Sequence, residues 1–163
     1  MTTIGRFDIF NEKISRPFYF RFFLLFKLPV AYFSGLQLLI LTREHCWVSI
    51  HKKWFNKNPF KSIYFASLAM AAEMSTGVLV MGYCYKHNPK ISMLVTTVDA
   101  TYLKKSVGTI TFKCADGRHV ADAVNSAIKY GVAYKIITFA HGYNEKEEMV
   151  ASFKIVWSLK TIT

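Results

Sequence analysis

The sequence predicts an α+β domain in which a sheet of antiparallel strands packs on one apolar helix. Three observations support this fold class. The stretch 62–85 carries one formal charge, Glu73, and is otherwise apolar, small or hydroxylic. Segments on both sides of it have the composition of strands, and the final one alternates between apolar and polar residues. Strands that are polar on one side only are typical of an antiparallel sheet with one solvated face.

The N-terminal third is expected to form helices followed by two strands. Residues 14–33 predict one or two short helices, which Pro29 interrupts. Residues 35–41 and 46–54 are rich in apolar and β-branched side chains, and the polar segment TREH joins them, which predicts a pair of strands. The segment NKNP, residues 56–59, predicts a turn.

The apolar helix is expected over residues 62–76. Ser62 is a suitable N-cap, and Gly77 is a suitable C-terminal stop. We expect Gly77 and Gly82 to separate this helix from the following run VLVMGYCY. The residues that share the helix face of Glu73 are mostly small: Ala66, Ala69, Met70 and Gly77. A face of this kind lets another backbone approach closely, so the helix should lie against a sheet or a partner helix.

The remainder predicts four strands with one short helix among them. The strands are expected over residues 91–103, 107–114, 132–143 and 149–160, and the helix over residues 120–131. The last strand has the most regular alternation. Its predicted core-facing residues are Met149, Ala151, Phe153, Ile155, Trp157 and Leu159, with Ser152, Lys154, Ser158 and Lys160 facing outward.

The length of 163 residues fits a single structural domain, which we divide into a helical arm over residues 1–34 and a sheet domain over residues 35–163. Hydrophobic residues make up 52% and aromatic residues 16%, which indicates a large core, an oligomer interface, or both. The net charge of +11 fits general solubility, or else an anionic partner such as an acidic membrane surface or a phosphorylated small molecule like coenzyme A. The lysines are scattered and no arginine-rich run is present, so we expect no nucleic-acid partner.

Cysteine and histidine usage indicates a cytoplasmic protein without a metal. The three cysteines are far apart in sequence, and the first 15 residues are mixed and polar, unlike a secretory signal. We therefore expect reduced, buried thiols. The five histidines form no metal-binding spacing with each other or with the cysteines. No cofactor is expected.

Two stretches are long and apolar enough to raise the question of membrane insertion. Residues 18–41 contain Arg21 and Lys27, which are costly within a span. Residues 62–85 contain a single charged residue, Glu73, but we expect glycines to divide this stretch. The segment RPFYFRFFLLFK has the basic and aromatic character of a membrane-surface helix. We nevertheless favour an amphipathic helix packed on the domain over membrane contact by the arm.

The order of these elements resembles the hotdog fold of acyl-CoA thioesterases, in which a long antiparallel sheet wraps a central helix. The helix motif is similar to that of the phenylacetyl-CoA-thioesterase-like branch. Asn58 stands at the asparagine of that motif, the segment 64–66 (Tyr-Phe-Ala) stands where His-Gly-Gly would be, and Glu73 falls on the acidic position. The segment YLKKSVG, residues 102–108, is similar to an aromatic-Leu-basic segment of the branch. From LPVAYFSGL through NPFKSIYFASLAMAAE to ISMLVTTVDATYLKK, the sequence most resembles an uncharacterised thioesterase-like hotdog family of bacteria.

The resemblance implies hydrolysis of an acyl-CoA or similar thioester by a homodimer or homotetramer. Glu73 would act as nucleophile or as a general base on water. Asn58 would orient the substrate, and Tyr64 would donate its hydroxyl into the site. The backbone N–H groups of Phe65 and Ala66 would stabilise the oxyanion, since the first turn of a helix has free donors. Apolar surroundings should raise the pKa of Glu73, which suits a general base.

Several of these assignments leave a second interpretation open. Glu73 could instead be a structural carboxylate bonded to Asn58, to a tyrosine or to a neighbouring subunit, and Asn58 could serve the turn. Further candidates are Lys104, Lys105 and Arg118 for the coenzyme A phosphates, and Met70 and Met74 for the acyl pocket. A solvated surface and ordinary core are the alternatives for these two groups. Because His-Gly-Gly is replaced, a non-catalytic protein that binds acyl-CoA or a lipid-like ligand is the alternative function.

Overall fold

The computed structural model describes residues 2–162, which form helices and one sheet. The helices are α1 (Thr3–Ile14), α2 (Pro17–Lys27), α3 (Pro29–Ser34), α4 (Phe65–Cys84) and α5 (Gly117–Tyr130). The strands are β1 (Leu36–Leu41), β2 (Cys46–His51), β3 (Lys90–Tyr102), β4 (Thr109–Cys114), β5 (Tyr134–Tyr143) and β6 (Met149–Ile162).

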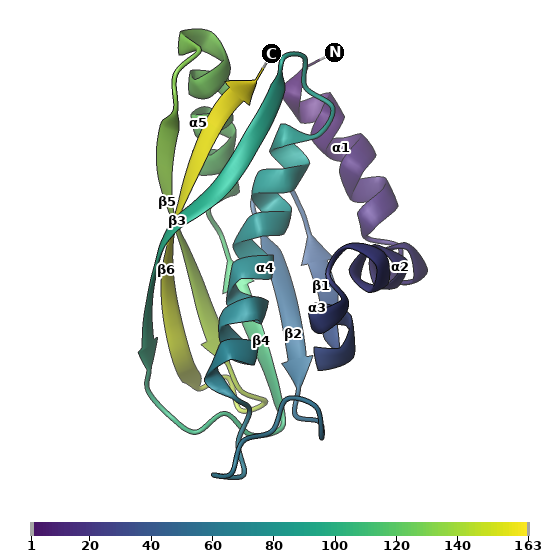
Figure 1. Ribbon diagram of the computed structural model, residues 1–163, viewed down its shortest axis with the longest axis vertical. Coiled ribbons are helices and arrows are strands. Elements are labelled where there is room, and N and C mark those ends of the chain that lie inside the picture. Colours follow the sequence, from purple (N-terminus) through teal and green to yellow (C-terminus); the bar gives the residue numbers. More distant parts are fainter. Residues whose placement is uncertain (1, 163) are drawn as a thin grey trace.

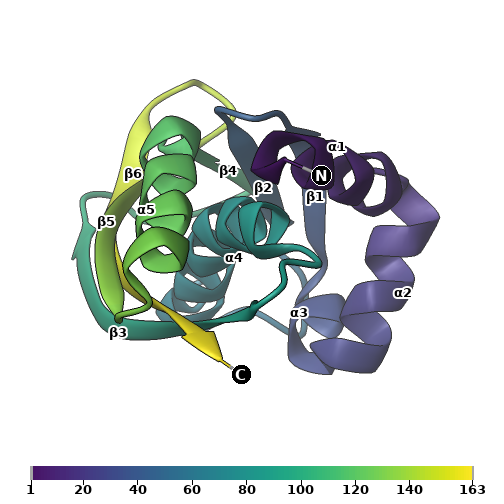
Figure 2. The same ribbon diagram turned by 90° about the horizontal axis from the view of Figure 1, so that it is seen from above.

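All six strands form one antiparallel sheet in the order β1-β2-β4-β5-β6-β3. The sheet curves around α4, which runs along its concave side, as Figures 1 and 2 show. β1 and β3 are the edge strands. β3 pairs with β6 from Lys90 opposite Ile162 to Tyr102 opposite Ala151, so a long strand forms one edge. The predicted α+β architecture, with a sheet around a central apolar helix, is confirmed.

α4 is longer than the sequence indicated. It runs from Phe65 to Cys84, so Gly77 does not end it, and Tyr64 rather than Ser62 occupies the N-cap position. The two glycines serve close packing inside the helix. A Cβ at Gly77 would come within 3.2 Å of the Trp157 indole, and one at Gly82 within 2.7 Å of the Phe7 ring. Both positions therefore admit neighbours that a larger residue would displace.

α4 is also the element that could be mistaken for a membrane span. Among the described residues it alone passes a test of length and hydropathy for spanning, but 67% of its apolar window is buried inside the protein. The sheet covers one side of it and α1 covers part of another (Figure 2). Its apolar character is explained by its position as the core helix.

The N-terminal arm, expected to be helical over residues 1–34, packs on the core, and its first helix lies ahead of residues 14–33, where the separate helices were expected. α1 buries Phe7, Phe10 and Ile14. Phe7 contacts Tyr83 of α4 with ring centroids 4.5 Å apart, and Phe10 lies near Tyr85. The break between α2 and α3 at Pro29 is confirmed.

The predicted strands are all present, with shifts of a few residues at their ends. In β6 the core-facing set from Ala151 to Leu159 is buried as expected, but Met149 is 37% exposed. Met149 opens the strand opposite Tyr143, next to a register shift, where the alternation is not yet established. α5 begins at Gly117 rather than at residue 120.

α5 approaches the turn between β1 and β2 closely at Gly117, and a substitution at this position tests that approach. Its N–H donates to the Glu44 carbonyl at 3.1 Å, and a Cβ there would overlap the Arg43 carbonyl group. Gly117→Ala should therefore lower the free energy of unfolding by roughly 2–3 kcal/mol, measured by urea denaturation. Gly131→Ala is the control: its Cβ meets open space and only the positive φ of 66° opposes it, so about 1 kcal/mol is expected. Equal losses in the two variants would contradict the close approach.

Candidate active site

A cavity of about 410 Å³ lies at the N-terminal end of α4. Three segments form it: the loop that precedes α4, the first turn of α4, and the chain that leaves β3. Its lining residues include Asn58, Phe60, Tyr64, Phe65, Leu68, Tyr102, Lys104, Lys105 and Ser106. The walls are mostly apolar, and the ring of Tyr102 packs edge-on against Phe65 with centroids 6.2 Å apart. The cavity therefore combines an apolar surface with two lysines at one side.

Asn58 supports the loop at the mouth of this cavity. Its Oδ1 accepts hydrogen bonds from the N–H groups of Phe60 and Ser62, at 3.0 and 3.1 Å. Its Nδ2 donates to the Ser62 hydroxyl at 3.0 Å. These bonds hold the loop in the conformation that starts α4, which agrees with the turn interpretation of Asn58. Ser62, the predicted N-cap, is engaged here instead.

The first turn of α4 offers free backbone donors at the end of the helix where Phe65 lines the cavity. Tyr64 donates its own N–H to the Asn56 carbonyl, and the Ser67 N–H donates to the Tyr64 carbonyl. Phe65 and Ala66 occupy the first two helical positions, where an N–H has no intrahelical acceptor. Within residues 2–162 no acceptor for these two groups is found. An anionic atom at this end of the helix would also be favoured by the helix dipole.

Ser106 is a cavity residue that sequence reasoning missed. Its side chain is 3% exposed, and its hydroxyl has no partner among the described residues. Its carbonyl accepts the Ile63 N–H at 2.8 Å, which ties the segment after β3 to the loop before α4. A buried hydroxyl without a partner is unfavourable, and because this oxygen has almost no accessible surface, a ligand atom could pair with it only after the lining shifts. The signal that could have identified Ser106 as a site residue was its position directly after the two lysines in the segment YLKKSVG.

Glu73 lies on a face of α4 that the rest of the described chain leaves partly open. Ala69, Met70 and Met81 on the same face are partly exposed. The Glu73 carboxylate makes no hydrogen bond or ion pair with any of the residues that the structure describes, so the proposed bonds to Asn58 or a tyrosine are not formed within the protomer. Burial raises the pKa of the Glu73 carboxyl, as the apolar sequence around it predicted.

Trp157 and Gly77 define the surroundings of this carboxylate. A Cβ at Gly77 would come 3.0 Å from Glu73 Oε1, so the missing side chain leaves space for the carboxylate. The Trp157 indole N–H donates to the Thr76 hydroxyl at 3.1 Å, and that hydroxyl donates to the Glu73 carbonyl at 3.0 Å. These bonds fix the indole ring next to the helix turn that carries Glu73. The carboxylate therefore lies beside Gly77 and an indole ring that is held in place, which makes its surroundings apolar and rigid.

Glu73 and the backbone donors do not meet within residues 2–162. Eight positions separate Glu73 from Phe65, which corresponds to about 12 Å along a helix axis. Glu73 is also absent from the lining of the N-terminal cavity. A group that contacts both must therefore bridge this distance or involve a second chain.

The other predicted residues are divided among different places. Lys104 and Lys105 both line the cavity, and Lys104 also pairs with Glu148 at 2.8 Å. Met74 is buried core, whereas Met70 is half-buried on the face of Glu73. The cavity therefore collects the two lysines but neither methionine.

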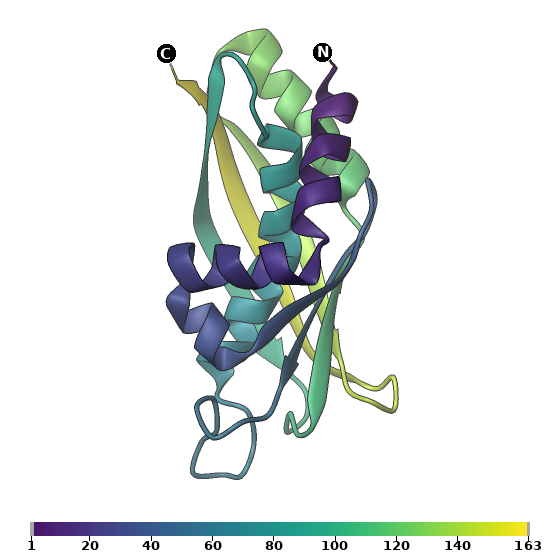
Figure 3. The ribbon, with the colours of Figure 1, turned by 90° about the vertical axis from the view of Figure 1, so that its right-hand side faces the viewer.

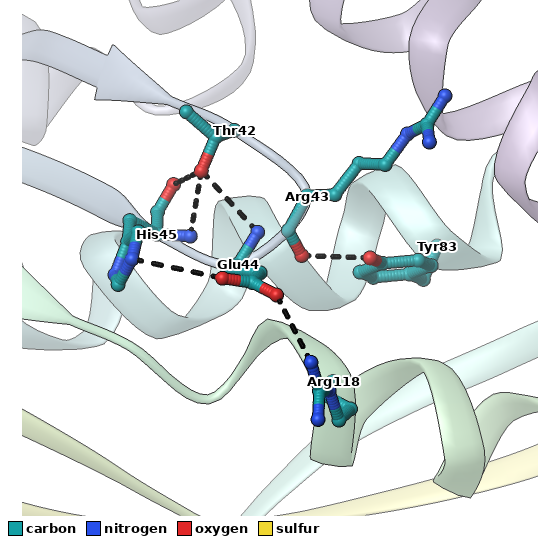
Figure 4. A network of polar contacts seen from close by, with 6 residues as sticks. All are labelled: Thr42, Arg43, Glu44, His45, Tyr83 and Arg118. Atoms are coloured by element: carbon teal, nitrogen blue, oxygen red, sulfur yellow. Dashed lines mark hydrogen bonds and ion pairs between the residues drawn. The ribbon is translucent and has the colours of Figure 1, made fainter.

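Arg118 is remote from the cavity. It pairs with Glu44 at 3.4 Å, beside the Tyr83 hydroxyl, which donates to the Arg43 carbonyl at 2.7 Å (Figure 4). Tyr83 is in the last turn of α4, so this network lies at the opposite end of the helix from the cavity. Arg118 and the two lysines do not come together within the protomer. Among residues 2–162, no cluster of histidine, cysteine and acidic side chains suits a metal ion.

The raised pKa of Glu73 predicts a specific pH dependence of stability. A raised pKa means that the folded state binds the proton more tightly than the unfolded state, so stability falls as pH rises through the folded pKa. Glu73→Gln should therefore be more stable than the wild type at about pH 8 and lose this advantage at about pH 4, in urea unfolding. Glu12→Gln, on the exposed side of α1, should show no such gain. A pH-independent difference for Glu73→Gln would contradict the burial of the charge.

Known structures share this architecture. PA5026 from Pseudomonas aeruginosa, a protein of unknown function described as a probable thioesterase, is 18% identical with a TM-score of 0.75, over 90% of this chain and 97% of that one. OLEI01261 from Chlorobaculum tepidum, of unknown function, is 19% identical with a TM-score of 0.75, over 90% and 97%. Thioesterase HI1161 from Haemophilus influenzae is 10% identical with a TM-score of 0.65, over 84% and 86%. At these identities the likeness establishes the fold.

Sequence comparison gives the family. None of the curated proteins matches the sequence. The family model described as "Domain of unknown function (DUF4442)" matches residues 19–159, which is most of the chain. The protein therefore belongs to the DUF4442 family and has the hotdog fold of thioesterases.

Proposed function

We propose that this protein hydrolyses an acyl-CoA or similar thioester, with Glu73 as general base or nucleophile. The observation that carries the proposal is the half-buried carboxylate on the open face of the core helix, without a partner among the described residues and with a raised pKa. A carboxylate in apolar surroundings costs stability, and its pKa is moved toward the range useful for proton transfer at neutral pH. A structural role would instead supply it with hydrogen bonds.

The reaction needs two groups on the thioester. As base, Glu73 takes a proton from the water that attacks the carbonyl carbon; as nucleophile, its own oxygen attacks and water later releases the acyl group. In both cases the carbon–sulfur bond breaks and coenzyme A leaves as the thiol. The negative charge on the carbonyl oxygen is stabilised by the free N–H groups of Phe65 and Ala66 at the positive end of the α4 dipole.

We further propose that two protomers complete each site. The separation of about 12 Å between Glu73 and the donors rules out joint action on one carbonyl within a protomer. The edge strand β3 is long and largely exposed, and no strand pairs with its outer side within residues 2–162. Pairing of β3 with its copy around a two-fold axis would cover this edge and set two α4 helices antiparallel, so that Glu73 of one chain faces the α4 N-terminus of the other.

The N-terminal cavity is the proposed position for the coenzyme A arm. Its apolar walls suit a flexible chain, and Lys104 and Lys105 attract phosphates. Met70, on the face of Glu73, would contact the acyl group. Tyr64 is exposed at the cavity mouth, where its hydroxyl is available to the substrate.

A non-catalytic binding protein is the second candidate. It is favoured by one observation, the Phe65 side chain at the position of a glycine in the resembling motif. Phe65 stacks edge-on with Tyr64, with centroids 4.8 Å apart, beside the free N–H groups. A ring at this point narrows the approach of a carbonyl to the donors.

Glu73→Gln separates the two candidates. The amide keeps the size of the side chain but cannot accept a proton, so the rate of coenzyme A release from a panel of acyl-CoA thioesters should fall by roughly 10²–10⁴-fold, measured by chromatography of free coenzyme A. Glu12→Gln is the control and should retain the wild-type rate. Unchanged turnover in Glu73→Gln would end the catalytic proposal, and binding without turnover by the wild type would favour the second candidate.

A mixing experiment tests the shared site. Phe65→Pro removes one donor at the helix position where proline is accepted, while Phe65→Ala removes the ring and keeps the N–H. Glu73→Gln and Phe65→Pro homodimers should both be impaired. Random exchange of the two should restore about one quarter of the wild-type activity, because each mixed dimer has one intact site of two. No recovery after verified subunit exchange would contradict a site built from two chains.

A further inference from the structure

We propose that the outer face of α2 docks the protein onto an anionic lipid surface. α2 packs on the domain through Phe20 and Leu24, which are buried. On its other face Phe18, Phe22 and Phe26 follow one another at one-turn spacing and are 80%, 58% and 75% exposed. The helix is thus apolar on two faces, and packing on the domain covers one. The expected amphipathic helix packed on the domain accounts for the inner face alone.

The three exposed phenylalanines of α2 form a row along the helix, and two of their rings stack. The rings of Phe22 and Phe26 are nearly parallel, with centroids 6.4 Å apart and planes inclined by 10°. Figure 3 shows α2 lying across the flank of the molecule, with α3 and the loop before α4 below it. The ring of Phe33 in α3 packs against that of Phe55 in this loop, with centroids 6.0 Å apart, and both residues are exposed. Exposed aromatic side chains on two neighbouring elements, α2 and α3, indicate an interaction site.

Charge identifies the occupant. Residues 16–27 contain Arg16, Arg21 and Lys27 and no acidic residue. Arg16 shares an exposed ion pair with Glu12, whereas the Arg21 guanidinium lies 5.1 Å from the centroid of the Tyr32 ring. Phenylalanines that enter the acyl boundary beside cations that meet the headgroups are the features of an interfacial helix. A second copy of this chain on this face would set these three cations against the same three cations, with no acidic residue of the segment between them, so the local charge favours the lipid.

Vesicle cosedimentation tests this docking surface. The wild type should bind vesicles of phosphatidylcholine with phosphatidylserine, bind phosphatidylcholine alone far more weakly, and be released by salt. Replacement of Phe18, Phe22 and Phe26 by serine should abolish binding while far-ultraviolet circular dichroism stays unchanged. The control variant Ile137→Ser with Phe139→Ser removes exposed apolar side chains from β5 and should bind like the wild type.

A second pair of variants tests the charges without altering the aromatic row. Arg21→Gln with Lys27→Gln should weaken binding to the anionic vesicles on the order of tenfold. Lys129→Gln with Lys160→Gln removes the same net charge elsewhere and should weaken it much less. Equal effects of the two pairs, or no binding of the wild type to anionic vesicles, would overturn the proposal. It would also be overturned if the triple serine variant halved the molecular mass measured by light scattering, since the row would then be an interface between copies.

Discussion

The burial of α4 inside the curved sheet is the interaction on which the rest of the structure depends. The helix is apolar around most of its circumference, so it is stable in water only where other elements cover it. The sheet provides most of that cover, and α1 adds Phe7 and Phe10 against Gly82. Close approach at the two glycines lets Trp157 and the α1 aromatics reach the helix. Because these contacts come from both ends of the chain, the arm and the sheet are held by one core.

The same arrangement accounts for the properties of Glu73. The sheet and α1 leave one face of α4 uncovered, and the carboxylate lies on that face above Gly77 and the Trp157 indole. It is removed from most of the solvent without receiving a hydrogen bond within the described chain, which raises its pKa. The free N–H groups of Phe65 and Ala66 lie at the end of the same helix. One helix thus positions both proposed reactive groups, and its length keeps them apart in a single protomer.

Much of this fold could be predicted from the sequence, because its strands have one solvated face and alternate clearly. The alternation of β6 identified the core-facing residues from Ala151 to Leu159. The end of α4 could not be predicted, since glycine is a common helix stop and its alternative use here depends on Trp157 and Phe7, which are distant in sequence. The bounds of α1 were not predicted within the helical arm, although Phe7, Phe10 and Ile14 follow at helical spacing, because the exposed Ile4 and Ile9 obscure this pattern.

The candidate site could be predicted only in part, because spacing along the chain identifies single residues but not how distant segments meet. Spacing from Asn58 identified Glu73, and the raised pKa of its carboxyl followed from its apolar neighbours. Spacing could not reveal that Asn58 is engaged by its own loop, or that Ser106 is buried without a partner, since both depend on how three segments meet. Arg118 shared the charge of Lys104 and Lys105 but lies at the other end of α4.

A crystal structure of Glu73→Gln with a non-hydrolysable acyl-CoA analogue would test the central claim most directly. We predict that the analogue's carbonyl oxygen lies about 3 Å from the N–H groups of Phe65 and Ala66 in one protomer, with residue 73 of the other protomer beside the carbonyl carbon. The coenzyme A arm should occupy the cavity lined by Lys104, Lys105 and Ser106. An analogue bound with its carbonyl remote from residue 73 of both protomers would contradict the account.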